Sequence, residues 1–243
     1  MKLLIDAGNS RLKWQLQEQG GIVEQGACLQ DTPEWLDQLS RFSSRISRIA
    51  VSTVISEAGR DRLVENLGKI SSADVAFYWS EAKRAGLVNS YSDFSRLGAD
   101  RWHAMYGAWR QKLTGFAVID AGSAITIDYV ADDGAHLGGY ILPGKQMMLR
   151  SLSQDAARIG FEASGAISGE PGRSTSECVH HGVVWLWEGL VKRLSADLRR
   201  HGLSRVLCTG GDAAALIRAG LPGEHHADLV FEGLNAIYSE SAG

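Results

Sequence analysis

Hydrophobic and polar positions follow the same order of patterns twice along this chain. Near the start, an apolar run ends in Ile5-Asp6-Ala7-Gly8, small polar residues follow, and apolar residues then alternate with polar ones. The same tetrapeptide recurs at Ile119-Asp120-Ala121-Gly122, with the same kinds of residues on either side. Because alternation with a period of two is typical of a half-buried strand, each copy predicts a strand, a turn bearing an aspartate, and a second strand.

The first half of the chain predicts the element order β-β-β-α-β-α-β-α. Gly20-Gly21 favours a turn between the second and third strands, Pro33 suits the first turn of a helix, and Ser56 suits a helix N-cap. The strands are predicted at residues 2–6, 12–18, 21–25, 48–54 and 75–79, and the helices at residues 33–42, 56–67 and 99–112. Residues 86–97, which are rich in Ser, Asn and Gly, predict a loop.

The second half opens with Gly115 and repeats the start with three strands. Strands are predicted at residues 116–120, 125–130, 136–142 and 205–209, helices at 144–159, at 176–200 and ending near 219, a loop at 160–176, and a short segment at 229–231 before a closing helix. A Rossmann fold starts β-α-β, so this order excludes it. We expect an α/β protein of two similar halves, residues 1–114 and 115–243, with the ligand in a cleft between them.

Composition and charge narrow the class of protein. The chain has 243 residues, of which 44% are hydrophobic and 22% charged, and its net charge is −3. This length suffices for one large domain or two small ones with a buried core. The near-neutral charge, without runs of Lys and Arg, gives no indication of nucleic-acid binding. No apolar stretch approaches the ~20 residues of a membrane span, and the N-terminal apolar run is too short for a signal peptide, so we expect no membrane association.

Cysteines and histidines indicate no metal centre. Cys28, Cys178 and Cys208 are scattered and odd in number, which favours neither a disulfide framework nor a zinc site. Free thiols are typical of a reducing compartment, so we expect a cytoplasmic protein. The seven histidines form no group with the spacing of metal ligands.

The first turn has the composition of a phosphate-binding loop. Gly8 permits a positive φ and Asn9 tolerates one, so backbone N–H groups and the side chains of Asn9 and Ser10 can face one side. Arg11 and Lys13 add positive charge directly after the turn. These features predict a site for the phosphate oxygens of a nucleotide.

Asp6 precedes this turn at the end of a strand, where a carboxylate can bind a phosphate-bound Mg²⁺ through its waters. A plain β-hairpin, in which Asp6 accepts hydrogen bonds from turn amides, is the alternative. The second copy, Asp120-Ala121-Gly122-Ser123, has a similar small and hydroxylated turn but no basic residue. Two such turns favour phosphate binding over the plain hairpin, and their difference in charge indicates that their roles differ.

A third candidate lies between the two copies, in Gly98-Ala99-Asp100-Arg101. Asp100 falls in the first turn of a predicted helix, where a carboxylate is stabilised by exposed amides, so a capping role is one interpretation. The other interpretation is chemical: Asp100 can accept the proton of a hydroxyl that attacks a phosphoryl group, and Arg101 can bind a substrate carboxylate. Ser174-Thr175 similarly predicts a helix N-cap, with a substrate contact by Thr175 as the alternative.

Taken in order, these motifs resemble the type III pantothenate kinases, bacterial enzymes of the superfamily that includes acetate kinase, sugar kinases, Hsp70 and actin. Ser123 stands where the family more often has Thr, and it keeps the hydroxyl. Six segments, spread over the whole chain, carry the resemblance: Asp6–Lys13 (D-x-G-N-[ST]-x-x-K), Leu97–Arg101 (G-x-D-R), Asp120–Asp128 (D-x-G-T-A-x-T-x-D), Gly138–Gly144 (G-G-x-I-x-P-G), Ser174-Thr175 ([NS]-T) and Thr209–Ala213 (T-G-G-x-A).

The resemblance implies a duplicated actin-like, ribonuclease H-like fold and ATP-dependent phosphorylation of pantothenate, the first step of coenzyme A biosynthesis. It implies ATP, Mg²⁺ and a monovalent cation, K⁺ or NH₄⁺, as cofactors, with the monovalent cation at Asp120 and Asp100 as the base. It also implies a homodimer in which the second halves pair and Thr175 reaches the substrate of the partner subunit. The implied ATP ligands are Asp6, Ala7, Gly8, Asn9, Ser10, Arg11, Leu12, Lys13 and Ser123, and the implied pantothenate ligands are Tyr91, Gly98, Ala99, Asp100, Arg101 and Thr175.

Two other functions stay open at the level of sequence. One is a kinase of the same fold that acts on another small hydroxy compound. The other is a non-catalytic accessory or regulatory protein that keeps the fold. Asp6, Asp100, Arg101 and Asp120 are all present, which argues against the second alternative because a binding module does not need a base.

Overall fold

The structure, a computed structural model, describes residues 1–30, 32, 34–112, 114–155, 159–162 and 168–241. The chain divides into two compact units, one formed by Met1–Lys112 together with Asp228–Gly243, and the other by Leu113–Ala227. This division differs from the expected halves, residues 1–114 and 115–243, at the C-terminal end. The closing helix packs with the first unit rather than with the second.

The first unit contains one mixed sheet of five strands. The strands are β1 (Lys2–Ala7), β2 (Arg11–Glu18), β3 (Gly21–Leu29), β4 (Arg48–Thr53) and β5 (Val75–Tyr78), in the order β3-β2-β1-β4-β5. Hairpins join β1 to β2 and β2 to β3, so these strands pair antiparallel, whereas helices precede β4 and β5, which pair in parallel. All five strands lie where the sequence predicted them, and β3 continues to Leu29 rather than ending at residue 25.

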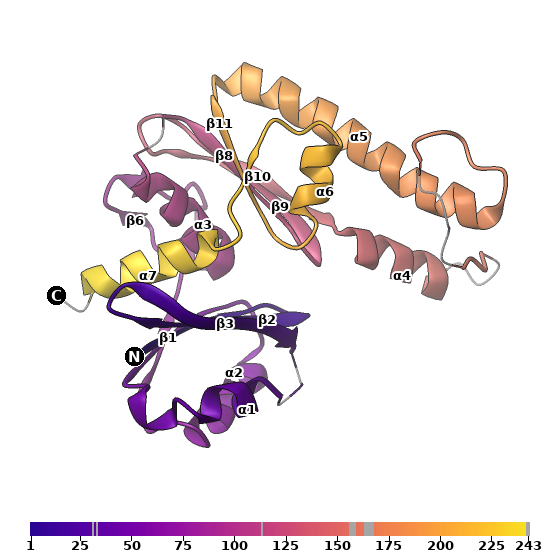
Figure 1. Ribbon diagram of the computed structural model, residues 1–243. Helices are drawn as coiled ribbons and strands as arrows, with labels where there is room; N and C mark the ends of the chain where they lie inside the picture. The colour runs from indigo at the N-terminus through magenta and orange to yellow at the C-terminus, as the bar shows by residue number, and fades with distance from the viewer. Residues whose placement is uncertain (31, 33, 113, 156–158, 163–167, 242–243) are drawn as a thin grey trace. The chain divides into compact units, whose positions relative to one another are not determined.

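Helices cover both faces of this sheet, as Figure 1 shows. Helices α1 (Glu34–Ser40) and α2 (Glu57–Gly68) lie on one face, and α3 (Ala99–Arg110) and α7 (Leu229–Ser241) on the other. Successive side chains of β1 point to opposite faces. Leu3 and Ile5 pack in the core shared with α1 and α2, and Leu4 packs with Phe231 and Leu234 of α7. Strand β1 is therefore buried on both sides, which fixes the position of the turn that follows it.

Helices α3 and α7 cross at two glycines. A Cβ at Gly233 would overlap the backbone oxygen of His103, and a Cβ at Gly107 would lie 2.5 Å from the backbone oxygen of Leu229. Only glycine allows this close approach. The short segment expected at residues 229–231 is not a separate element; it is the first turn of α7, because its apolar side chains are buried within the first unit.

The segment expected as a loop at residues 86–97 is more ordered than its composition indicated. Strands β6 (Lys83–Arg84) and β7 (Leu87–Val88) form a small hairpin, and its turn has positive φ at Ala85 (45°) and Gly86 (96°). Positive φ at both central residues is the geometry of a tight hairpin turn. A 3₁₀ helix, η2 (Phe94–Arg96), closes the segment before α3, and another, η1 (Ser43–Arg45), precedes β4.

The second unit repeats the arrangement of the first. Its strands are β8 (Phe116–Ala121), β9 (Ala124–Val130), β10 (His136–Pro143), β11 (Arg205–Thr209) and β12 (Glu224–His225), in the order β10-β9-β8-β11-β12. Its helices are α4 (Lys145–Asp155), α5 (Thr175–His201) and α6 (Ala213–Arg218). Alternate residues of β8 and β9, such as Ile119 and Ile127, form one core with Val183 and Leu194 of α5 and Leu216 of α6.

The helices of the second unit begin and end close to the predicted residues. Helix α4 ends at Asp155, and residues 156–158 of the predicted helix lie outside the described residues, as do residues 163–167 of the predicted loop and Pro33 of the first unit. Helix α5 begins at Thr175 because the Ser174 hydroxyl accepts a hydrogen bond from the Glu177 backbone N–H at 3.2 Å, which is an N-cap. Within the described part of the chain, no helix has the length and apolar character needed to cross a membrane.

Candidate active site

The first turn joins β1 to β2 by a four-residue connection. Ala7 and Leu12 are the last paired residues, and the Gly8 N–H donates to the Arg11 carbonyl at 3.0 Å. The expectation of positive φ at Gly8 and Asn9 is wrong, because neither residue adopts it. Connections of four residues are most often built on type I turns, whose central residues keep negative φ.

Charged side chains of both signs gather at this turn. Asp6, at the end of β1, is half-buried and lies opposite Lys13 of β2 in the antiparallel pairing. Opposite charges at such positions attract one another across the strands. Asn9 and Arg11 are exposed, and Ser10 is half-buried. The first turn therefore presents two cations, an amide and a hydroxyl beside one carboxylate.

The second turn joins β8 to β9 and is held by two other segments of its unit. The Gly122 N–H donates to the Ala124 carbonyl at 2.9 Å. The backbone N–H of Gly144, just before α4, donates to the Ser123 carbonyl at 3.1 Å, and that of Asp212, just before α6, donates to the Ala121 carbonyl at 2.8 Å. Segments far apart in sequence thus fix the backbone on both sides of Ser123.

Asp120 lies directly before this second turn and is packed against Gly210. It pairs with Thr126 on β9 and with Thr209 on β11, and it is half-buried. A Cβ at Gly210, whose φ is +90°, would overlap the Asp120 Oδ1 atom. Gly210 was not among the predicted site residues, although the motif Thr209–Ala213 contains it and a Gly-Gly pair follows the predicted strand there.

The third candidate lies at the N-terminus of α3. Asp100 is half-buried, and its Oδ1 accepts a hydrogen bond from the Arg101 backbone N–H at 2.8 Å, as the capping interpretation expects. The same oxygen would lie 2.5 Å from a Cβ at Gly98, so glycine makes room for the carboxylate. Capping a helix end and serving as a base are compatible, since a carboxylate has several acceptor sites.

Arg101 and Tyr91, which were predicted together as pantothenate ligands, lie together in the structure. Arg101 is only 5% exposed, and its Nη1 donates to the Tyr91 hydroxyl at 3.0 Å. Its guanidinium also lies 5.8 Å from the centre of the Tyr91 ring. A buried guanidinium held by a phenol has a fixed orientation, which suits the recognition of a carboxylate.

Asn89, which the sequence did not single out, organises the chain around Tyr91. Its side-chain N–H₂ donates to the carbonyls of Glu81 (3.2 Å) and Phe94 (3.3 Å), and its Oδ1 accepts from the Tyr91 N–H at 3.0 Å. An Asn in a polar loop is common, so only the three-dimensional structure distinguishes this one. Thr175 is exposed at the start of α5 and lies in the second unit, whereas Tyr91 and Arg101 lie in the first.

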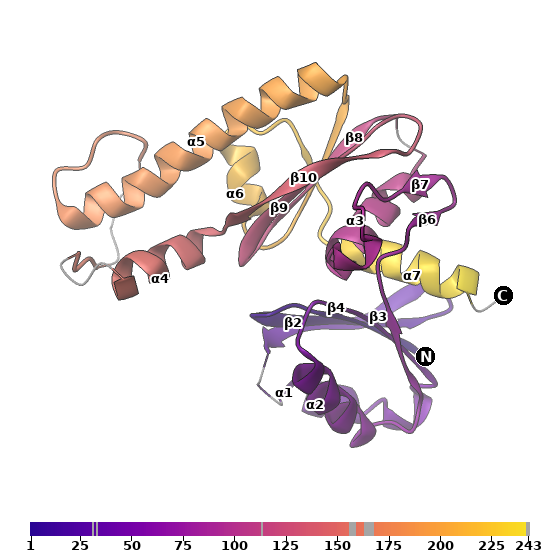
Figure 2. The same ribbon diagram turned by 180° about the vertical axis from the view of Figure 1, so that it is seen from behind.

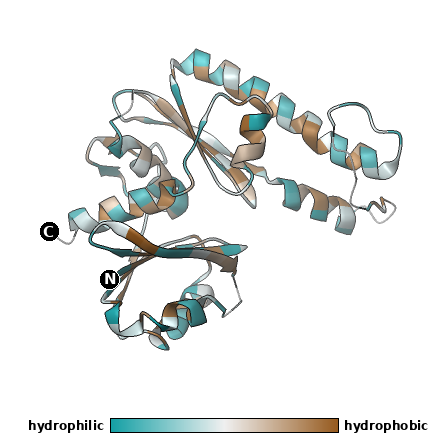
Figure 3. Cartoon of the chain, in the orientation of Figure 1, coloured by the Kyte–Doolittle hydropathy of each residue, from teal (hydrophilic) through white to brown (hydrophobic). Residues whose placement is uncertain are grey.

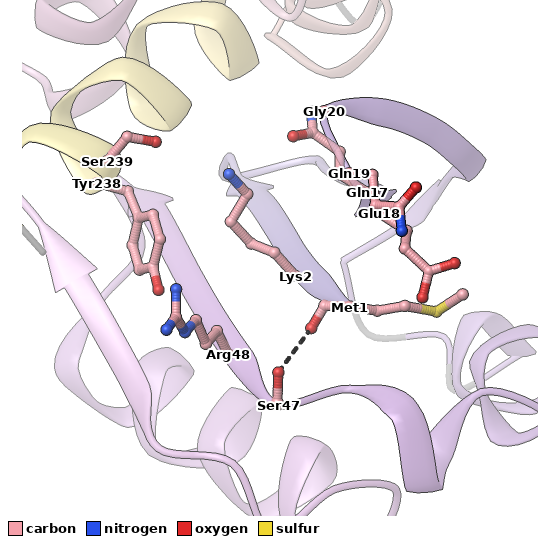
Figure 4. A pocket seen from close by; sticks show the side chains of 10 residues that line it. All are labelled: Met1, Lys2, Gln17, Glu18, Gln19, Gly20, Ser47, Arg48, Tyr238 and Ser239. Carbon is pink, nitrogen blue, oxygen red and sulfur yellow. Dashed lines mark hydrogen bonds between the residues drawn. The ribbon is translucent and has the colours of Figure 1, made fainter.

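One cavity of about 490 Å³ lies elsewhere in the first unit. Figure 4 shows its lining, which includes Lys2 and Arg48 at the first residues of β1 and β4, and Tyr238 of α7. The first turn follows the other end of β1, so this cavity is separate from the candidate site. Among the described residues, no group of three or more His, Cys, Asp or Glu side chains could hold a metal ion by itself.

The order of the strands and the two turns place this chain in the class of α/β proteins with the actin-like fold. A protein of Sinorhizobium meliloti described as a 2-dehydro-3-deoxygalactonokinase has a similar structure, with a TM-score of 0.57 and 14% identity over 99% of both chains. A protein of Campylobacter jejuni described as a Baf family transcriptional activator matches with a TM-score of 0.61 and 22% identity over 99% of this chain and 98% of that one. At these identities, both likenesses concern the fold alone.

The sequence comparisons identify the family. The sequence model of the type III pantothenate kinases matches residues 2–197. A type III pantothenate kinase of Marinobacter nauticus is 53% identical over 239 residues, 98% of both chains, and one of Cellvibrio japonicus is 37% identical over 249 aligned positions, 100% of this chain and 99% of that one. The chain therefore belongs to the type III pantothenate kinase family, and its activity is the phosphorylation of pantothenate in coenzyme A biosynthesis.

Proposed function

We propose that Asp100 is the base of pantothenate phosphorylation and that Arg101 and Tyr91 bind the substrate beside it. The observation that carries this proposal is the buried Arg101 guanidinium, held by the Tyr91 hydroxyl at 3.0 Å and directly following Asp100 in the first turn of α3. Pantothenate is a small anion with a primary hydroxyl, so it needs a cation for its carboxylate and a base for its hydroxyl. Gly98 and Ala99 supply the backbone around both groups.

In the proposed reaction, the pantothenate hydroxyl attacks the γ-phosphorus of ATP. A bond forms between the hydroxyl oxygen and that phosphorus, the bond from the phosphorus to the β,γ-bridging oxygen breaks, and ADP leaves. The hydroxyl proton passes to the Asp100 carboxylate. Most of the catalysis then comes from orientation and charge stabilisation, as is usual for phosphoryl transfer.

The first turn is the proposed binding site of the ATP phosphates. Arg11 and Lys13 supply positive charge, and Asn9, Ser10 and the backbone of Ala7 to Leu12 supply hydrogen-bond donors. Ser123 of the second turn offers an exposed hydroxyl for the same purpose. The register that places Lys13 opposite Asp6 supports this role, because it brings a cation and a carboxylate to the same end of the two strands.

Two ions complete the proposed chemistry. Mg²⁺ typically keeps several waters and takes one or two carboxylates plus substrate phosphates, so the single carboxylate of Asp6 fits a water-mediated Mg²⁺ bound to ATP. Such an ion neutralises charge on the phosphates when it is bound. We assign a monovalent cation, K⁺ or NH₄⁺, to Asp120, whose carboxylate lies close to the backbone of Gly122 and Gly210.

A homodimer formed through the second unit is also part of the proposal, and it would bring Thr175 to the substrate of the partner subunit. Figure 3 shows hydrophobic residues distributed along α5. On the same helix, the side chains of Trp185 (66% exposed) and Leu186 (51% exposed) are open to solvent. Ile141 of β10 is 64% exposed. Trp185→Glu should shift the sedimentation of the protein to that of a monomer. Because the reaction consumes ATP, we expect it in the cytoplasm.

The direct test is ADP release that depends on pantothenate, measured with and without K⁺. We expect release with pantothenate, stimulation by K⁺, and little release with a panel of sugars and other hydroxy acids. Release with another compound of the panel but not with pantothenate would favour a different kinase of this fold. No release with any compound would favour the accessory or regulatory role.

A further inference from the structure

The carboxylate of Glu240, near the end of α7, binds three side chains of the first unit. The Tyr106 hydroxyl of α3 donates to its Oε2 at 2.6 Å, and Arg84 Nη1 of β6 donates to the same oxygen at 3.1 Å. Arg110 Nε, at the end of α3, lies 3.5 Å from its Oε1. One side chain thus connects the last helix, the helix that begins with Asp100, and the β6–β7 hairpin, which lies beside both helices in Figures 1 and 2.

Glu240 is ionised in this network. Burial acts against ionisation, but the hydrogen bonds from Tyr106 and Arg84 outweigh it and hold the pKa of Glu240 below its ordinary value. Burial and the bond to Glu240 raise the pKa of Tyr106 to about 12, so the phenol remains a donor. A carboxylate that accepts hydrogen bonds from a phenol and from one guanidinium group, with a second guanidinium group in ion-pair distance, makes charge-assisted contacts, which are stronger than neutral ones.

The β6–β7 hairpin leads directly to the proposed pantothenate ligands. Trp109 Nε1 of α3 donates to the Ala85 carbonyl at the hairpin turn (2.9 Å), and the Asn89 N–H donates to the Ala82 carbonyl at its base (3.0 Å). Asn89 then holds the Tyr91 N–H, and the Tyr91 hydroxyl accepts from Arg101. An unbroken series of contacts therefore runs from Glu240 through Arg84 and the hairpin to the Tyr91 phenol.

Glu240 can hold Arg84 and Tyr106 in place because the helix that carries it, α7, is firmly packed. The close crossing at Gly233 and the burial of Phe231 and Leu234 fix the helix upstream of Glu240. Glu240 itself lies beyond residues 2–197, the part of the chain that the family's sequence model matches.

We infer that Glu240 is a positioning residue that holds the β6–β7 hairpin against α3 and thereby sets the place of Tyr91 and Arg101 in the pantothenate site. This inference rests on the proposed role of Tyr91 and Arg101. Loss of the Glu240 charge leaves the hairpin itself intact, because Arg84 Nε keeps its bond to Glu81 at 2.8 Å. The effect is therefore a looser substrate site rather than an unfolded unit.

The test is steady-state kinetics of the full-length Glu240→Gln enzyme with pantothenate and ATP varied in turn. We expect the KM for pantothenate to rise about 10-fold, the effect of losing one charge-assisted hydrogen bond, while the KM for ATP changes less than about 2-fold. Glu232→Gln is the matched control, since Glu232 lies on the same helix and its Oε2 accepts from Gln111 at 3.2 Å, away from the hairpin. Glu232→Gln should leave both KM values unchanged. Glu240→Asp, which keeps the charge, should have a KM for pantothenate between those of the unmodified enzyme and Glu240→Gln.

Two further measurements keep the inference testable if Glu240→Gln is poorly folded. Amide hydrogen exchange should speed up at residues 83–91 in Glu240→Gln and not in Glu232→Gln. The double variant Arg84→Met/Glu240→Gln should have a KM for pantothenate no higher than that of Arg84→Met alone. An unchanged KM for pantothenate, or equal rises for both substrates, would overturn the inference. Absence of pantothenate-dependent ADP release by the unmodified enzyme would instead refute the proposed function.

Discussion

The two Ile-Asp-Ala-Gly turns share a sequence and a place in the fold, yet their surroundings differ. A Cβ at Gly8 of the first turn would lie 3.3 Å from the Arg11 carbonyl, which is tight but not an overlap. At the second turn, a Cβ at Gly144 would overlap the Gly122 carbonyl, and one at Gly210 would overlap the Asp120 carboxylate. The first turn carries charge, and the second is enclosed by glycines from distant segments.

This difference explains how one motif can serve two roles. Arg11 and Lys13 make the first turn suited to the charge of phosphates. The second turn lacks basic residues, and its aspartate lies opposite Thr126 rather than a lysine, which suits a cation. The local tetrapeptide fixes the strand and the turn, and the proposed difference in ligand rests on the residues around it.

The largest expected effect concerns a residue outside both turns. If the turns only hold ATP and ions, the base must lie elsewhere, and Asp100→Asn should lower kcat by about 10²–10⁴-fold, the usual contribution of general base catalysis. Sedimentation and thermal unfolding should stay close to those of the unmodified protein. A near-normal kcat in Asp100→Asn would exclude Asp100 as the base and would favour a base in one of the two turns.

The enclosure of the second turn can be broken at Gly210. Gly210→Ala forces a left-handed φ on alanine and places its Cβ on the Asp120 carboxylate, so it should lower the free energy of unfolding by about 1–3 kcal/mol. Gly211→Ala is the matched control, because a Cβ there meets nothing within 4 Å. Equal Tm values for the two variants would show that the enclosure does not constrain the turn.

Much of this architecture could be predicted from local sequence, and the exceptions depend on distant contacts. The ten-strand pattern of the two sheets, apart from β12, followed from alternation and turn residues near each strand. The place of α7 in the first unit did not, because it depends on Gly107 and Gly233 meeting across 126 positions of sequence (233 − 107). The conformation of Gly8 was misjudged because the length of the connection, rather than the residue, selects the turn type.

The candidate site likewise contains residues that the sequence predicted and residues that it did not. Tyr91 and Arg101 were predicted together and lie together. Asn89 and Gly210 were missed, because an Asn in a polar loop and a Gly after a strand are too common to be singled out. Their roles come from hydrogen bonds and close packing with residues that only the folded chain brings near.

The two units also differ in the surroundings of their buried histidines, and this difference predicts a smaller effect, on the pH dependence of stability. In the second unit, His136 Nε2 lies 2.9 Å from the Asp128 carboxylate. In the first, His103 Nδ1 lies 2.7 Å from the Ser52 hydroxyl, and its Nε2 has no hydrogen-bond partner among the described residues. Burial, assisted by the charge of Arg84, lowers the pKa of His103 to about 3.

The sign of the resulting pH dependence follows from this shift. Below the ordinary pKa of 6.5, His103 binds a proton when unfolded but not when folded, so stability is full above that pH and falls as the pH decreases toward 3. Urea unfolding between pH 8 and 5 should show a loss approaching about 1.4 kcal/mol per pH unit below the ordinary pKa. His103→Gln should remove this contribution; identical pH profiles for the two proteins would contradict the assignment.

Comparing Lys13→Met with Asp120→Asn in one kinetic assay tests whether the first turn binds phosphate and the second a cation. ADP release is measured with ATP and K⁺ varied independently. We predict that Lys13→Met raises the KM for ATP about 10-fold and leaves the K⁺ concentration for half-maximal activity unchanged. We predict that Asp120→Asn raises that K⁺ concentration about 10-fold at saturating ATP. The reverse pattern, or equal effects of both variants on both quantities, would contradict the account.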